Sequence, residues 1–113
     1  MRRRKTTWEG LLERIFRMEE DRHGAVWKAV VSRTEESPRW TVELWTNISG
    51  LADRPLDRPL DGPYKFHARR KHEAFEQAVF FMIWDYLPYK FGSCEVRAND
   101  KFEISLWLET MGA

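Results

Sequence analysis

The chain is 113 residues long, with 42% hydrophobic and 33% charged residues and a formal net charge of +1 at pH 7. This length excludes a (β/α)₈ barrel or a two-half dinucleotide fold, and the composition is that of one globular domain rather than a disordered chain. Six Trp, seven Phe and three Tyr residues imply that aromatic side chains supply much of any core or interface.

Basic residues are concentrated at the N-terminal end, in the run from Arg2 to Lys5. Residues 1–6 are predicted to form a disordered basic tail, and residues 7–113 a single α+β domain. Without those four cations, 15 basic residues stand against 18 acidic ones, so the body of the domain is negatively charged. Domains that grip duplex DNA are usually basic over a whole face, so the charge balance disfavours a nucleic-acid partner.

The first predicted element is an amphipathic helix from about Thr7 to Glu20. Thr6 is its expected N-cap, and Glu9, three residues later, completes a capping box. Apolar side chains recur at helical spacing and predict one buried face. They are Trp8, Leu11, Leu12, Ile15 and Phe16.

A β-hairpin is predicted next, from two segments rich in Val and Trp at residues 25–33 and 39–48. The polar stretch between them contains Pro38 and is typical of a turn. Alternation in the second strand predicts an inner face and an outer face. The inner face carries Trp40, Val42 and Leu44, and the outer face carries Thr41, Glu43 and Trp45.

Residues 49–63 contain Asp-Arg-Pro-Leu twice in succession, followed by Asp-Gly-Pro. Prolines at four-residue spacing are incompatible with a helix or a central strand, so this segment is predicted to be an exposed loop. Residues 64–68 alternate in polarity and are a candidate for a short additional strand.

A second helix is predicted from about residue 69 to residue 87, before Pro88, and its C-terminal half is apolar on most sides. Residues 93–98 and 102–109 are predicted to form a last hairpin, turned at Asn99-Asp100, with Trp107 on the outer face. The predicted fold is α+β. Two helices lie on one face of an antiparallel sheet built from two hairpins, in the order α-β-β-(β)-α-β-β.

The sequence contains no convergent set of catalytic groups. His67 and His72 are five residues apart, which does not place two imidazoles on one metal ion from one helix face. Cys94, the single cysteine, cannot form an intramolecular disulfide and is expected to be a small buried apolar residue. No catalytic residue, metal ligand or cofactor is assigned, and an enzyme of unfamiliar type is the third hypothesis for the function.

Basic residues at the start of the second helix predict an anion-binding site. Cations are unfavourable at a helix N-terminus unless an anion is present, and no capping residue precedes them. The candidates are Lys65, His67, Arg69, Arg70 and Lys71. The alternative is that Arg69 and Arg70 pair with Glu73 at helical spacing.

A second candidate site is an aromatic surface made of Trp45, Trp107, Phe80, Phe81 and Trp84. It could be an interface, it could be covered by the loop at 49–63, or it could stack nucleic-acid bases. We expect a non-enzymatic binding protein that uses this surface to form a homodimer or to bind another protein. The alternative is a binder of single-stranded nucleic acid or phosphoanions at the basic helix start. The sequence has no membrane-spanning run and no signal peptide, so we expect a cytoplasmic protein without a membrane partner.

Overall fold

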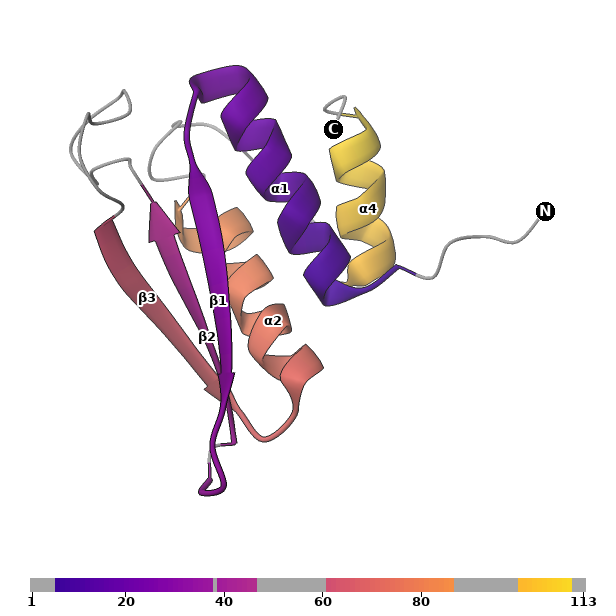
Figure 1. Cartoon of the computed structure of the whole chain (residues 1–113). Coiled ribbons are helices and arrows are strands. Elements are labelled where there is room, and N and C mark those ends of the chain that lie inside the picture. Colours follow the sequence, from indigo (N-terminus) through magenta and orange to yellow (C-terminus); the bar gives the residue numbers. More distant parts are fainter. Residues whose placement is uncertain (1–5, 38, 47–60, 87–99, 111–113) are drawn as a thin grey trace.

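The computed structural model describes residues 6–37, 39–46, 61–86 and 100–110 of the chain. Its elements are α1 (Trp8–His23), β1 (Trp27–Arg33), β2 (Trp40–Thr46), β3 (Asp61–Ala68), α2 (Lys71–Phe80), the π-helical segment η1 (Phe81–Tyr86) and α4 (Lys101–Thr110). Helices α1 and α2 cover one face of the antiparallel sheet, and α4 lies against α1 (Figure 1). The prediction of an α+β domain with two helices on one face of the sheet is therefore confirmed. No helix in the described part of the chain is long and apolar enough to cross a membrane.

The sheet has the strand order β1-β2-β3, and both neighbouring pairs are antiparallel. This arrangement confirms the first predicted hairpin and shows that residues 61–68 form a third strand. The predicted loop at 49–63 is therefore wrong at its end, because residues 61–63 belong to β3, an edge strand that tolerates a proline. Val42 of β2 lies opposite Val31 of β1 and Phe66 of β3, which aligns the three strands across the sheet.

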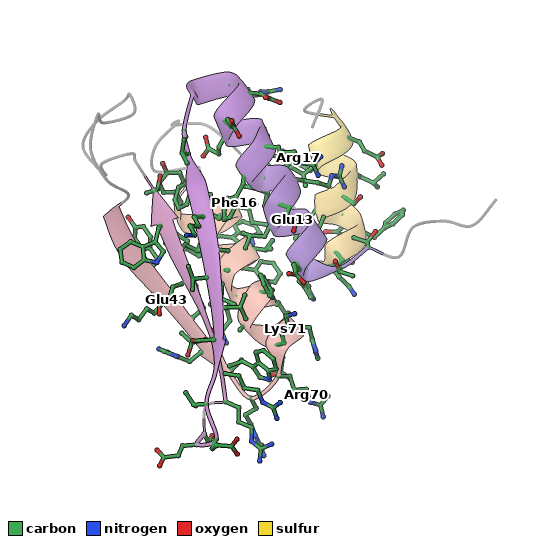
Figure 2. The ribbon with its side chains drawn as sticks, in the orientation of Figure 1. Glu13, Phe16, Arg17, Glu43, Arg70 and Lys71 are labelled. Atoms are coloured by element: carbon green, nitrogen blue, oxygen red, sulfur yellow. The ribbon has the colours of Figure 1, made fainter. Side chains whose placement is uncertain are left out.

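Side-chain alternation in β2 separates a buried face from an open face. Val42 and Leu44 are fully buried beneath the helices, whereas Glu43 points to the other side of the sheet (Figure 2). The predicted inner and outer registers of this strand are therefore correct. The fully buried side chains that the helical elements contribute to the core include Leu11, Leu12, Ile15, Val79, Met82, Ile83, Ile104 and Leu108.

The predicted C-terminal strand is wrong, because residues 102–109 belong to α4. Asp100 is the reason: its Oδ1 accepts a hydrogen bond from the Glu103 amide at 2.9 Å, which caps the start of a helix. Ile104 and Leu108 are fully buried at helical spacing, whereas Phe102 is 67% exposed. Trp107 consequently lies on a helix and not on the sheet. The predicted partner strand at 93–98 with Cys94, residues 49–60 of the predicted loop and residues 1–5 of the predicted tail lie outside the described residues.

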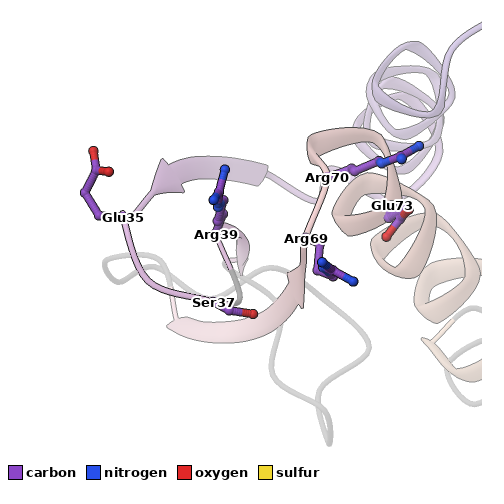
Figure 3. A pocket seen from close by; sticks show the side chains of 6 residues that line it. All are labelled: Glu35, Ser37, Arg39, Arg69, Arg70 and Glu73. Carbon is purple, nitrogen blue, oxygen red and sulfur yellow. The ribbon is translucent and has the colours of Figure 1, made fainter.

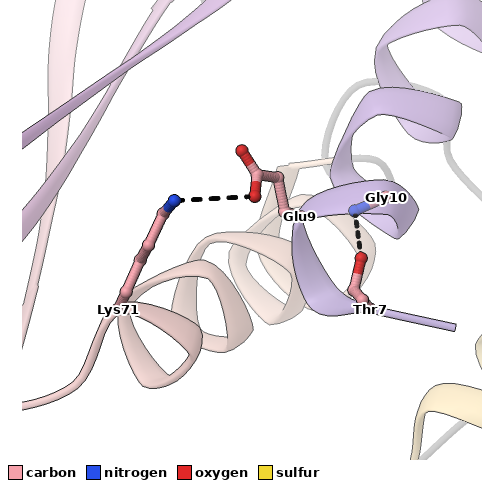
Figure 4. A network of polar contacts seen from close by, with 4 residues as sticks. All are labelled: Thr7, Glu9, Gly10 and Lys71. Carbon is pink, nitrogen blue, oxygen red and sulfur yellow. Dashed lines mark hydrogen bonds and ion pairs between the residues drawn. The ribbon is translucent and has the colours of Figure 1, made fainter. Parts of the chain in front are cut away.

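Helix α1 begins one residue later than predicted. Thr7, not Thr6, is the N-cap, and its Oγ1 accepts a hydrogen bond from the Gly10 amide at 3.0 Å. The Glu9 carboxylate reaches instead to Lys71 of α2, with Oε2 3.9 Å from Nζ (Figure 4). The helix continues to His23 and ends at Gly24, whose φ of 64° is readily adopted only by glycine.

This cap gives a first testable prediction. Replacing Thr7 with alanine removes the acceptor for the Gly10 amide and should lower the free energy of unfolding by about 1 kcal/mol. Urea denaturation measures this change, and Thr6→Ala is the matched control, expected to have a much smaller effect. Equal losses in the two variants would mean that the helix begins at the predicted position.

Candidate anion-binding site

A broad hollow lies where the turn between β1 and β2 meets the start of α2. It has a volume of about 900 Å³ and carries three arginines and two glutamates (Figure 3). We call it the arginine pocket. Its lining residues are Glu35, Ser37, Arg39, Arg69, Arg70 and Glu73.

Sheet register explains why residues distant in sequence share this pocket. Trp40, the first residue of β2, lies opposite Ala68, the last residue of β3. Arg39 immediately precedes Trp40 and Arg69 immediately follows Ala68, so both arginines leave the sheet at the same end. The antiparallel pairing therefore places Arg39 on one side of the pocket and the start of α2 on the other (Figure 3).

The start of α2 favours an anion independently of the side chains. Arg70 is the N-cap residue, with φ −122° and ψ 145°, and it makes no side-chain capping hydrogen bond. The first amides of a helix have no acceptor within the helix, and they form the positive end of its dipole. The free amides and dipole of the helix and the positive charges of the arginines therefore both attract an anion to the start of α2.

The three guanidinium groups of the pocket are exposed. Arg69 and Arg70 could have been neutralised by Glu73, which lines the same hollow. In the part of the chain that the structure describes, however, neither they nor Arg39 form an ion pair within 4.0 Å. The alternative in which Glu73 neutralises the helix start is therefore not realised.

Two more cations lie beside the indole ring of Trp40, the residue that follows Arg39 in the chain. The Cζ atom of Arg33 lies 5.5 Å from the ring centroid, and the Nζ atom of Lys71 lies 5.9 Å from it. Both distances are within the range of cation–π attraction. Lys71 also faces Glu9, but both side chains are about half exposed, so that ion pair contributes little stability.

His67 lines a second hollow of about 590 Å³, beside the same turn. Its Nδ1 lies 2.9 Å from the Thr41 Oγ1, so the two groups are hydrogen-bonded on the open face of the sheet. This hollow shares Glu35 and Ser37 with the arginine pocket. The remaining candidate, Lys65, lies opposite Glu43 on the open face and does not line either hollow.

Arg69 and Arg70, both candidates from the sequence, line the arginine pocket, whereas Arg39 was not among the candidates. The signal that could have found it is the register of the sheet. If residues 64–68 are placed beside the second strand with Trp40 opposite Ala68, Arg39 follows as a neighbour of Arg69.

The predicted aromatic surface is distributed over separate elements. Phe80, Phe81 and Trp84 line one groove of about 440 Å³ together with Phe66, and Trp84 is 44% exposed. Trp45 lies on the open face of the sheet, and Trp107 lies on α4, where it packs against the core. Self-association through these residues stays a prediction, and so does their coverage by the proline-rich loop.

The described residues contain no group of three or more His, Cys, Asp or Glu side chains placed to hold a metal ion. No protein-family model, curated protein or solved structure matches the chain. The function is therefore inferred from the arginine pocket and its surroundings.

Proposed function

We propose that the protein binds phosphate-bearing anions in the arginine pocket. The observation that carries this proposal is the convergence of Arg39 with Arg69 and Arg70 at the uncapped start of α2. An anion there satisfies cations and helix amides that have no acidic partner among the described residues.

The chemistry of the pocket favours phosphate over a simple carboxylate. A guanidinium group donates hydrogen bonds from a planar fork that matches two phosphate oxygens at once. Three such groups and the first amides of α2 offer more donors than one carboxylate can accept. Glu35 and Glu73 lower the net charge of the lining, so we expect one or two phosphates to occupy it.

Base stacking on the sheet has less support than phosphate binding. Trp107 lies on α4, so Trp45 is the one tryptophan of the proposed stacking pair that the sheet carries. On the same open face Lys28 lies opposite Trp45 and Lys65 lies opposite Glu43, so Glu43 offsets part of the positive charge beside the tryptophan. Phosphate recognition alone is therefore the better supported form of the hypothesis.

Calorimetric titration with inorganic pyrophosphate tests the proposal. Removing one arginine that hydrogen-bonds a charged ligand should weaken binding about tenfold or more, so Arg39→Ala and Arg69→Ala should each do so. Lys65→Ala is the matched control, because it removes a cation from the open face and should leave the affinity nearly unchanged. Binding should also weaken as salt is raised.

Equal affinities for Arg39→Ala, Lys65→Ala and the unaltered protein would remove the pocket as the site. A second titration, with a single-stranded oligonucleotide, separates the two sources of phosphate. If Trp45→Ala weakens oligonucleotide binding and leaves pyrophosphate binding unchanged, the ligand is a nucleic acid that also uses the sheet.

A further inference from the structure

Strand β1 is an edge strand without the proline, glycine or bulge that commonly interrupts pairing at a sheet edge. The sheet order leaves its outer edge without a paired strand among the described residues (Figure 1). All seven residues from Trp27 to Arg33 pair with β2 in unbroken register, and the strand contains no proline or glycine. Alternate residues of such an edge direct both N–H and C=O outward, which makes a template for another strand.

The opposite edge, β3, is protected in ways that β1 is not. It contains Gly62 and Pro63, and proline has no N–H to donate to a neighbouring strand. Its pairing with β2 also shifts register between Leu44 and Thr46, which marks an irregularity in the ladder. Natural proteins use proline and ladder irregularities to prevent edge pairing, and β1 has neither of these two devices.

We propose that β1 pairs antiparallel with β1 of a second copy of the chain, around a twofold axis at Val30. Val30 is the middle residue of the strand, so this register alone pairs all seven residues. The axis stands perpendicular to the sheet, so the helices of both copies stay on one side and the two sheets become one.

The side chains of β1 are self-complementary in this register. On the open face, Lys28 meets Ser32 of the second copy and Val30 meets its own counterpart. Val30 is 37% exposed in the single chain, and pairing covers it. On the helix-covered face, Trp27 meets Arg33 of the second copy and Ala29 meets Val31, so like charges do not face each other.

Charge pattern and symmetry favour a second copy over an unrelated extended peptide. A peptide can bind any free edge through its backbone alone. In the twofold arrangement, however, each cation of β1 lies opposite a neutral or aromatic residue of the second copy. The symmetry of an isologous interface repeats each of these pairs, so every such contact occurs twice.

The solution mass of the full chain, measured by sedimentation from low micromolar to the highest soluble concentration, tests this proposal. We expect a monomer–dimer equilibrium. Ser32→Lys places the new lysine opposite Lys28 at two symmetric positions and should weaken dimerisation about tenfold. Ser32→Ala adds no charge and is the matched control. The double variant Lys28→Glu with Ser32→Lys makes the opposed pairs complementary and should restore the dimer.

A monomer at every concentration would overturn the proposal. So would a dimer whose dissociation constant is the same in the unaltered protein, Ser32→Lys and the double variant, because the contact would then lie elsewhere, for example on the predicted aromatic surface. Lys28 and Ser32 are exposed and remote from the core, so the variants should retain the far-ultraviolet circular dichroism of the parent. Unchanged pyrophosphate binding by each variant shows that a loss of dimer is not a loss of folding.

Discussion

Replacing Leu44 with alanine is expected to lower the free energy of unfolding by about 3 kcal/mol. The side chain is fully buried on the helix-covered face of the central strand, between Ala29 of β1 and Tyr64 of β3. Truncation removes apolar contacts and leaves a cavity, because strands on both sides and helices above limit how far the site can collapse. Small domains have only about 5 to 15 kcal/mol of stability, so this single change removes a large share.

Glu43→Ala is the control for this prediction, because Glu43 is the preceding residue on the open face. Its replacement should change the free energy of unfolding by less than about 0.5 kcal/mol. Chemical denaturation of both variants measures the difference between the two faces of one strand. Similar losses would mean that the open face is packed as tightly as the helix-covered face.

Raising the pH above 10 is expected to destabilise the protein through Tyr86. Burial, then the nearby Glu19 carboxylate, and last Tyr64, raise the pKa of Tyr86 well above its ordinary value of 10.0. The phenol packs edge-on against the Trp27 ring, with centroids 4.8 Å apart, and its hydroxyl has no hydrogen-bond partner among the described residues.

The direction of the pH effect follows from proton binding. Above pH 10 the unfolded chain releases the Tyr86 proton, whereas the folded protein retains it, so the free energy of unfolding falls as the pH rises. The Tyr86 contribution to this slope approaches about 1.4 kcal/mol per pH unit. Tyr86→Phe should remove that part of the slope, and at neutral pH it should be neutral or slightly stabilising, because it deletes an unsatisfied buried hydroxyl.

Denaturation of both proteins at several pH values from 8 to 11 measures the effect. The informative quantity is the difference between the unaltered protein and Tyr86→Phe, because other ionisable groups contribute equally to both. If the free energies of unfolding of the two proteins change in parallel with pH, the folded protein releases the Tyr86 proton as readily as the unfolded chain does.

The sequence predicted those parts of the fold in which one periodicity fits. Trp8 to Phe16 match a helix and no other element, and the alternation from Trp40 to Trp45 matches a strand with one covered face. In both segments the apolar side chains that define the period are the ones that the structure packs into the core.

The prediction for the C-terminal segment was wrong because its apolar residues fit both the period of a strand and the spacing of a helix. Phe102, Ile104, Leu106 and Leu108 alternate as in a strand, yet Ile104 and Leu108 are also separated by four residues. In the helix Ile104 and Leu108 are buried, whereas Phe102 and Leu106 are exposed. The alternating pattern predicts that all four are buried together. The cap at Asp100 decides between the two, although the same residue type also favours turns.

Only the part of the candidate site that comes from neighbouring residues in the sequence could be predicted. Arg69 and Arg70 are adjacent in sequence and precede a helix, so the proposal of an anion site there follows from helix physics. Arg39 joins them through strand pairing, which depends on a third strand whose existence the alternation alone left open. Contacts between distant residues depend on register, and register is a property of the assembled sheet.

The indole of Trp40 gives the protein an internal optical probe. Two positive groups, on Arg33 and Lys71, lie within 6 Å of this ring, so its excited state experiences their electric field directly. We expect an anion bound beside Arg39, the chain neighbour of Trp40, to change that field. Occupancy of the pocket should therefore shift the emission spectrum of the unlabelled protein, and Trp40→Phe should abolish the shift while binding persists.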